Sequence, residues 1–488
     1  MDGEEGRVVL LTYILDPAAK MPLYEQLYRL IRQDISSGVL RGGERLPSKR
    51  SLAQHLEVSQ ITVETAYGQL LAEGYVSSAP RRGYFVQEAL AVPPVPARQT
   101  AVCAGAEPTA GNGISSERTQ PAETAETGWR FDFRTNTVDM DCFPFSTWAR
   151  LSRAVLTEYA DRLLRETVPQ GELELREAIR DYLLAFRGIE VSAEQIIVGA
   201  GSEYLLHILI RLLGQGQRYA LENPGYRKLY QIFEVNGADV RPIPLDGLGL
   251  CADRLEEATA VYLTPSHHFP TGVVMPVSRR MQLLQWAGER PGRYLIEDDY
   301  DSEFRYASRP IPALKELDRQ GQVIYLNTFA NSLAPSLRIG YMVLPEGLLA
   351  AYREQFSLYA SSVPAFEQHT LARFMATGAF ERHINRSRNI YKGRLEALLE
   401  ALRESPLSSV TEVCGAEAGL HILLRVSIGL SEAELVRRAA SRGVCICGLS
   451  GYYASGSEPE RATLILGYAG ISSECFREAV RCLCEAWL

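Results

Sequence analysis

The sequence of 488 residues lacks a recognisable signal peptide and any Cys-x-x-Cys pair, and it has few lysines. The apolar stretch at residues 8–15 is too short to span a membrane, and no basic start or small-residue cleavage site accompanies it. Nine cysteines are present, but the spacings of Cys445/Cys447 and Cys482/Cys484 are poor for zinc. We therefore expect a cytoplasmic protein with reduced thiols, no membrane segment and no metal site.

The length of the chain predicts two or more domains, because single hydrophobic cores usually stop growing well below 488 residues. A net charge of −8 argues against non-specific nucleic-acid binding by the whole molecule, but it does not exclude a small DNA-binding module. Residues 88–128 are rich in Pro, Ala, Thr and Gly and have no apolar period, which is typical of a flexible linker. We expect one domain at 13–87 and a second at 129–488.

The first domain has the pattern of a winged helix-turn-helix. Apolar residues recur at helical spacing over residues 23–35, and Ser48 and Ser59 are good N-caps for a second and a third helix. Gly74 ends the third helix, and two short strand-like runs, 75–77 and 83–86, flank a basic tip. Three helices followed by a basic-tipped hairpin predict a winged helix that binds DNA.

Residues 43–53 and 58–63 resemble the DNA-binding domain of GntR-type bacterial regulators. The resemblance implies DNA contacts from Ser48, Arg50, Thr62 and the wing glycine. Lysine and arginine side chains here can neutralise phosphates, and polar side chains at the start of the third helix can reach base edges. Gln60 stands where the family often has Arg, which favours an amide readout with an adenine-like preference. For any one of these residues, the alternative to a DNA contact is that it belongs to a solvated basic face. The predicted DNA-binding residues are Ser48, Lys49, Arg50, Ser59, Gln60, Thr62, Arg82 and Gly83.

From Phe131 onwards, short apolar runs alternate with longer helical segments, which predicts an α/β domain with a mostly parallel sheet. Ligands in such sheets bind at the carboxyl ends of the strands. The clearest strand candidates, 196–198, 260–263, 294–296 and 323–326, each end in polar or glycine-rich residues.

Those strand ends resemble class I/II aminotransferases of fold type I, over roughly 131–488. The resemblance implies a pyridoxal-phosphate (PLP) transferase fold with a smaller C-terminal α+β subdomain. It also implies that Asp298 pairs with the pyridine nitrogen, Tyr300 donates to the phenolic oxygen and Arg338 binds the phosphate. A solvated acidic loop at 297–303 and a core tyrosine at 226 are the alternatives. The predicted cofactor-binding residues are Gly201, Ser202, Tyr226, Asp298, Tyr300, Asn331 and Arg338.

The sequence departs from the aminotransferase pattern at the cofactor lysine, whose place is taken by Asn331. A carboxamide cannot form a Schiff base, so we predict that PLP, if bound, is held non-covalently. Phe269 stands where many aminotransferases have Asn. Ile465 stands where they have the arginine that holds the substrate carboxylate, with Arg461 four residues away. Of the five lysines (Lys20, Lys49, Lys228, Lys315 and Lys392), only Lys228 is a candidate to substitute.

Two further expectations concern single loops. Glu203 follows the glycine-rich turn, and we expect its side chain to point away if a phosphate binds there. His267 and His268 are adjacent, and we interpret them as satisfied loop residues because no third metal ligand lies at a sensible spacing.

The order of the domains matches MocR-type regulators, the GabR-like group. We predict a bacterial transcription regulator that binds double-stranded operator DNA as a homodimer. In one hypothesis, its large domain senses PLP or a PLP–amine adduct. In the other, the domain no longer binds PLP and either senses another effector, such as an amino acid, or serves only for dimerisation. The rival from another class is a working aminotransferase with an attached DNA-binding domain. A further alternative is that Asn331 is an engineered or erroneous substitution.

Overall fold

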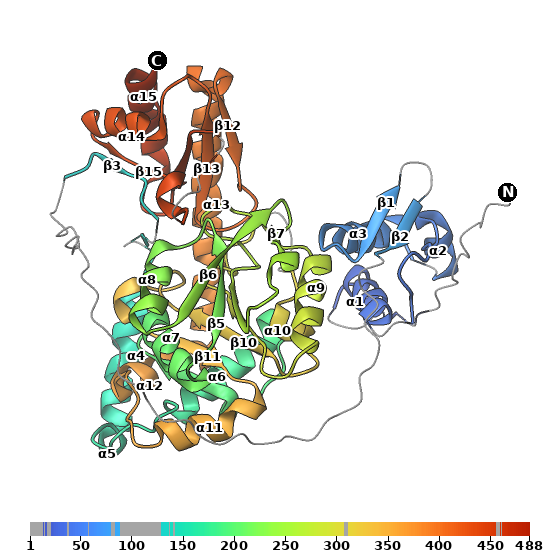
Figure 1. Ribbon diagram of the computed structural model, residues 1–488, viewed down its shortest axis with the longest axis vertical. Helices are drawn as coiled ribbons and strands as arrows, with labels where there is room; N and C mark the ends of the chain where they lie inside the picture. Colours follow the sequence, from blue (N-terminus) through green and yellow to red (C-terminus); the bar gives the residue numbers. More distant parts are fainter. Residues whose placement is uncertain are drawn as a thin grey trace.

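The structure, a computed structural model, describes residues 13, 15–16, 21–36, 39–56, 58–79, 83–87, 128–135, 137–139, 142–306, 311–454, 459 and 461–488. These residues form a small N-terminal domain, a large α/β domain and a C-terminal subdomain (Figure 1). The expected linker at 88–128, apart from Gly128, and the wing-tip residue Arg82 lie outside the described residues.

The N-terminal domain is a winged helix, as the sequence predicts. The Ser48 side chain accepts a hydrogen bond from the backbone N–H of Ser51, and Ser59 accepts one from Thr62, each at 3.1 Å. Both serines therefore cap the helices that follow them. The elements are α1 (Leu23–Ser36), α2 (Lys49–His55), α3 (Gln60–Ala72) and the antiparallel hairpin of β1 (Val76–Ala79) and β2 (Gly83–Val86).

The large domain is built on an eight-stranded sheet in which β11 and β7 are antiparallel to their neighbours and the rest are parallel. This confirms the predicted mostly parallel sheet. In spatial order the strands are β4 (Ile196–Gly199), β11 (Gly340–Val343), β10 (Val323–Thr328), β9 (Tyr294–Asp298), β8 (Ala260–Leu263), β5 (Arg218–Asn223), β6 (Asp239–Asp246) and β7 (Gly249–Leu250).

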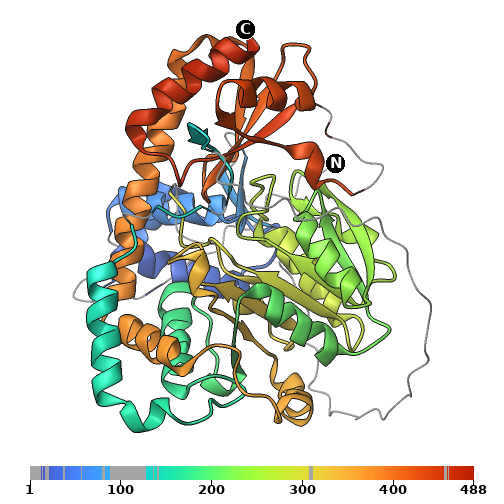
Figure 2. The same ribbon diagram turned by 90° about the vertical axis from the view of Figure 1, so that its left-hand side faces the viewer.

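Helices cover both faces of this sheet (Figure 2). Successive strand residues point to opposite faces, so Ile197 packs with α7 and Ile196 packs with α6. Helices α7, α8 and α11 share one core, and helices α6, α9 and α12 pack on the other face. The helices are α4 (Phe145–Glu158), α5 (Ala160–Leu163), α6 (Leu173–Tyr182), α7 (Ser202–Leu213), α8 (Arg227–Val235), α9 (Val277–Gly288), α10 (Leu314–Leu317), α11 (Glu346–Phe356), α12 (Ala365–Ala376) and α13 (Ala379–Glu404).

The long helix α13 joins the large domain to the C-terminal subdomain (Figure 1): its first turns pack in the core beneath the large sheet and its second half packs in the C-terminal core. The subdomain is α+β, as predicted. It consists of a four-stranded antiparallel sheet, a parallel two-stranded pair and two further helices. These are β12 (Thr411–Cys414), β13 (His421–Val426), β16 (Thr463–Gly467) and β15 (Cys447–Gly448), then β3 (Phe131–Asp132) with β14 (Val444–Cys445), and α14 (Glu432–Ser441) and α15 (Phe476–Trp487).

The winged helix rests on a surface of the large domain that we call the seat, formed by Val277, Ile311 and Glu316. Val277 and Ile311 are buried in the same apolar cluster as the core of the winged helix. The backbone N–H of Val277 donates to the carbonyl oxygen of Glu73 at 3.3 Å, and Arg32 forms an ion pair with Glu316 at 2.9 Å. The winged helix is therefore in direct contact with α9 and α10.

No helix within the described ranges is both long enough and apolar enough to cross a membrane.

Candidate functional site

The carboxyl ends of strands β4, β5, β8, β9 and β10 surround a cavity of about 300 Å³. Ligands of α/β sheets bind at this edge. All seven residues predicted from the sequence as cofactor ligands line this one cavity: Gly201, Ser202, Tyr226, Asp298, Tyr300, Asn331 and Arg338. The structure thus brings together segments that are up to 137 residues apart in the chain (201 to 338).

Asp298 presents a carboxylate to the cavity from the end of β9. Its Oδ2 accepts a hydrogen bond from the hydroxyl of Tyr262, a wall residue that the sequence analysis did not single out. Burial raises the pKa of Asp298 to about 7, and the neighbouring carboxylates of Asp299 and Asp301 contribute to the rise, against the hydrogen bond from Tyr262. A cationic N–H donor from a ligand would favour the ionised form of this carboxyl group.

Glu222 is a second carboxylate on the wall, and sequence reasoning missed it as a site residue. Its Oε2 accepts from the backbone N–H of Thr264 at 2.9 Å and from the Thr264 hydroxyl at 2.8 Å. Its Oε1 is buried and has no hydrogen-bond partner among the described residues. Burial raises the pKa of Glu222 to about 8. An acidic residue at a strand end was the only sequence signal for it.

Arg338 lies against the glycine-rich turn that opens α7. A Cβ on Gly201 would lie 3.0 Å from the Arg338 guanidinium, so glycine is needed for this close approach, and its φ of +87° favours glycine as well. The carboxylate of Glu203 forms ion pairs with both Arg338 and Lys228. The expectation that Glu203 points away applies when a phosphate is bound; in this structure its carboxylate pairs with the Arg338 guanidinium.

Asn331 lies in the loop after β10, and only 8% of its surface is exposed. Its Nδ2 donates to the backbone oxygen of Tyr300 at 3.3 Å. The Tyr300 hydroxyl is 3.3 Å from Nδ1 of His267, which is in turn 2.7 Å from Asp301 Oδ2. The loops that follow β9 and β10 are therefore tied together at the cavity.

Of the other departures from the aminotransferase pattern, Phe269 lines the cavity and packs edge-on against Tyr226, with ring centroids 5.8 Å apart. Ile465 is buried in an apolar cluster with Leu423. Arg461 lies outside the cavity, 3.9 Å from Glu412 on an exposed surface. Lys228 does line the wall, but it is paired with a carboxylate.

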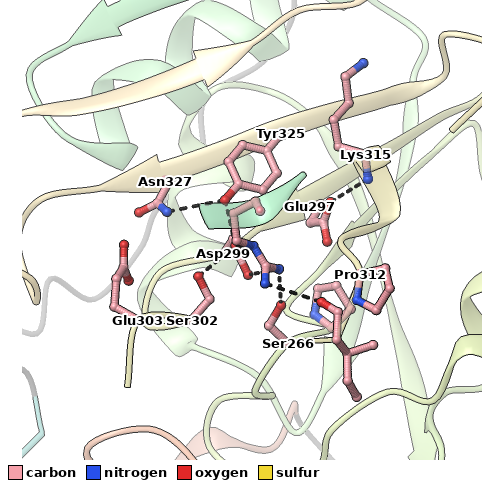
Figure 3. Close-up of polar contacts among 12 residues, drawn as sticks. Ser266, Glu297, Asp299, Ser302, Glu303, Pro312, Lys315, Tyr325 and Asn327 are labelled. Carbon is pink, nitrogen blue, oxygen red and sulfur yellow. Dashed lines mark hydrogen bonds and ion pairs between the residues drawn. The ribbon is translucent and has the colours of Figure 1, made fainter. Parts of the chain in front are cut away.

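A buried network lies beneath the cavity, around Asp299. Figure 3 shows Asp299 with Ser302, Ser266 and Tyr325 around it. The Tyr325 hydroxyl donates to Asp299 Oδ2 at 2.6 Å, and the guanidinium of Arg187 forms a buried ion pair with the same oxygen at 2.8 Å. Although burial acts to raise it, the pKa of Asp299 is held below its ordinary value by Arg187 and by these hydrogen bonds. Asp299 is therefore an anion of the core, in contrast to its neighbour Asp298.

Arg187 and Arg280 also bind backbone carbonyl groups at the seat residue Ile311 and at the residue after it. Arg187 donates to the carbonyl oxygen of Ile311 at 3.3 Å, and Arg280 donates to that of Pro312 at 2.9 Å. Glu297, the residue before Asp298, accepts from the backbone N–H of Leu314 at 2.8 Å and from that of Lys315 at 2.9 Å, the second of which is drawn in Figure 3. Arg187 ends a π-helical turn, Leu183–Arg187, a rare geometry that is frequent at functional sites. Nothing in the sequence pattern indicated either arginine.

None of the predicted DNA-binding residues that the structure describes is among the winged-helix residues that contact the seat. Arg50 and Gln60 are exposed, Ser48 and Ser59 use their hydroxyls as helix caps, and Lys49 forms an ion pair with Glu64. The remaining two are Thr62, at the start of α3, and Gly83, whose φ is +106°. Arg45, which the sequence analysis passed over, lies next to this wing glycine: its Nε would be 3.5 Å from a Cβ added there.

Within the part of the chain that the structure describes, no group of three or more His, Cys, Asp and Glu side chains is placed to hold a metal ion. Nδ1 of His268 is 2.7 Å from the hydroxyl of Thr271 in the same loop.

The fold and the site define a helix-turn-helix protein with an aminotransferase-like large domain. The family model of class I and II aminotransferases matches residues 143–481, and that of the gntR family of bacterial regulatory proteins matches residues 23–86. The chain belongs to the class I/II aminotransferase family and, by the combination of its two domains and its full-length relatives, to the MocR/GabR-type subfamily of GntR regulators.

Full-length relatives have the same organisation. The chain is 39% identical to the uncharacterised HTH-type transcriptional regulator YdeL of Bacillus subtilis, over 98% of this chain and 99% of YdeL. It is 35% identical to MocR of Rhizobium meliloti, a probable rhizopine catabolism regulatory protein, over 97% and 96% of the two chains. The multiple substrate aminotransferase from Thermococcus profundus superposes with a TM-score of 0.65 at 28% identity, covering 74% of this chain and 92% of that structure.

Proposed function

We propose that this protein is a transcription regulator whose aminotransferase-like domain forms a homodimer and binds a PLP-type ligand without a covalent bond. The observation that carries this proposal is the single cavity that gathers Asp298, Tyr300, Asn331 and Arg338 at the sheet edge. A homodimer would present two winged helices, and therefore two copies of α3, to repeated half-sites on DNA.

The wall residues fit a phosphorylated pyridine. Asp298 would face the ring nitrogen, Tyr300 the phenolic oxygen, and Arg338 with the first N–H groups of α7 the phosphate. The unpartnered Oε1 of Glu222 is a further polar atom that a ligand could satisfy. Glu203 must leave Arg338 when the phosphate arrives. When bound, PLP supplies an electrophilic aldehyde and an electron-accepting ring.

The rival function, a working aminotransferase, needs a base that moves a proton at the substrate carbon. We infer that Asn331 occupies the position of that base, and a carboxamide cannot take up a proton at neutral pH. Losing such a base typically costs about 100- to 10,000-fold in rate. Multi-turnover transamination by the purified protein, measured with amino-acid donors and 2-oxoacid acceptors, would overturn the assignment as a regulator without catalysis.

Arg50→Ala is expected to weaken DNA binding evenly across sequences, because an exposed arginine at this position neutralises a backbone phosphate. In a homodimer, the slope of log K against log salt should fall by about 2, about one for each lost contact. The measurement is fluorescence anisotropy with duplexes enriched from a random pool by the unaltered protein. Arg29→Ala is the matched control, since Arg29 lies on α1 and pairs with Glu25. An unchanged slope for Arg50→Ala contradicts the proposed face.

Two substitutions at the phosphate end of the cavity should change ligand affinity in opposite directions. Arg338→Ala removes a charge-assisted donor and should weaken PLP binding roughly 10- to 100-fold. Glu203→Gln removes the anion that competes for Arg338 and should strengthen binding several-fold. Isothermal titration calorimetry with PLP, and with inorganic phosphate as a minimal probe, measures both. If Glu203→Gln weakens binding, Glu203 is a ligand contact and not a competitor.

A further inference from the structure

The charges on the cavity wall indicate which form of ligand the site prefers. Three carboxylates line it, from Glu203, Glu222 and Asp298, against two cations, Lys228 and Arg338. Both cations form ion pairs with Glu203, so Glu222 and Asp298 have no cationic partner among the described wall residues. The nearby histidines do not compensate, because burial lowers the pKa of His268 and of His421 to about 3 and leaves them neutral. The cavity wall therefore favours a ligand that carries positive charge.

Asn331 supplies an acceptor at the point where the aminotransferase lysine would supply a cation. Its Nδ2 donates to the backbone oxygen of Tyr300, and a carbonyl oxygen can only accept, so the orientation of the carboxamide is fixed. Oδ1 therefore points away from Tyr300, and it has no hydrogen-bond donor among the residues that the structure describes. This oxygen is therefore available to accept a hydrogen bond from a ligand amine.

The side chain of Asn331 is also two bonds shorter than that of lysine, which leaves room for a substituent on the ligand. The substituent should not carry a carboxylate. Ile465 is buried among apolar side chains and Arg461 pairs with Glu412 outside the cavity, so no arginine other than Arg338 lines the described wall.

From these features we propose that the cavity selects the amine form of the ligand, a phosphorylated pyridine that bears a primary ammonium group and no carboxylate. Pyridoxamine 5′-phosphate has this chemistry. Asn331 is then a specificity-determining residue: its Oδ1 accepts from the ammonium group, the positive charge favours the ionised form of Glu222, and Asp298 keeps its place at the ring nitrogen. This inference rests on the proposed function, because it places the ligand amine next to residue 331.

Three ligands that differ only at one carbon test the proposal by calorimetry on the full chain at pH 7.5: pyridoxamine 5′-phosphate (amine), pyridoxine 5′-phosphate (alcohol) and PLP (aldehyde). A hydrogen bond to a charged group predicts that the amine binds roughly 10- to 100-fold more tightly than the alcohol. Asn331→Ala keeps the space and removes the acceptor, so it should shrink this ratio while leaving alcohol affinity within a few-fold. Glu222→Gln should shrink it too, and Lys228→Gln, which removes a cation, should not.

Equal affinity for amine and alcohol, or tighter binding of the aldehyde, overturns the amine preference while the proposed function stands. If the ratio of amine to alcohol affinity is unchanged in Asn331→Ala, Asn331 does not determine the preference for the amine. If none of the three ligands binds, both the inference and the proposed function fall, and thermal unfolding of each variant distinguishes this outcome from misfolding.

Discussion

Asn331→Lys is expected to convert a non-covalent site into a covalent one. With PLP added, the variant should gain a new absorbance band, and borohydride should fix one ligand per chain on the peptide that contains residue 331. The reason is geometric: residue 331 lines the same cavity as Asp298, Tyr300 and Arg338, so an amine from this position reaches the aldehyde carbon of a ligand that they hold. Absorbance and peptide mass spectrometry measure the effect.

The unaltered protein is the first control and should show no ligand trapped on that peptide. Lys228 is the existing lysine of the wall, so the Asn331→Lys, Lys228→Gln double variant should trap ligand as well as the single variant does. If Asn331→Lys folds and still traps nothing, residue 331 does not face the aldehyde carbon, and the proposed correspondence with the aminotransferase lysine is wrong.

Arg187→Met should cause the largest loss of stability of any substitution considered for this protein. Arg187 and Asp299 are both buried, and removal of the arginine leaves an uncompensated carboxylate in the core. Breaking a buried pair in this way costs about 3–5 kcal/mol of unfolding free energy. Urea unfolding followed by tryptophan fluorescence should show a clearly lower midpoint.

The matched control is Arg218→Met, which removes an arginine from a half-exposed ion pair with Glu257 and should cost less than about 1 kcal/mol. The double variant Arg187→Met, Asp299→Asn removes the stranded charge and should recover part of the loss. If Arg187→Met costs no more than the control does, the pair is not an important source of stability.

The parts of this molecule that could be predicted from the sequence are those set by local pattern. Helix caps at Ser48 and Ser59 depend on a side chain and the backbone three residues later, so the sequence contains the whole interaction. The parallel strands were predictable from apolar runs. The candidate ligand-binding residues after them were predictable from the rule that ligands bind at the carboxyl ends of such strands.

Features that depend on distant segments could not be predicted. Arg187 meets Asp299 across 112 residues, and nothing near either residue indicates the other. The pairing of the Glu203 carboxylate with Arg338, 135 residues later, likewise has no signal in the sequence around Glu203. Side-chain alternation at the end of β9 explains why Asp298, its last residue, faces the cavity while Asp299, one residue beyond the strand, faces the core, but which of the two does so depends on strand register.

The contact between the seat and the winged helix would couple ligand binding in the cavity to DNA binding. Ile311 and Glu316 contact the DNA-binding domain, and the same short segment is held by Arg187 and by Glu297, the residue before Asp298 on the cavity wall. A ligand that shifts Asp298 and its neighbour Glu297 changes the free energy of the seat, and with it the freedom of the winged helix. Thermodynamic linkage then requires that bound operator changes ligand affinity by the same factor, so each DNA site would set its own ligand threshold.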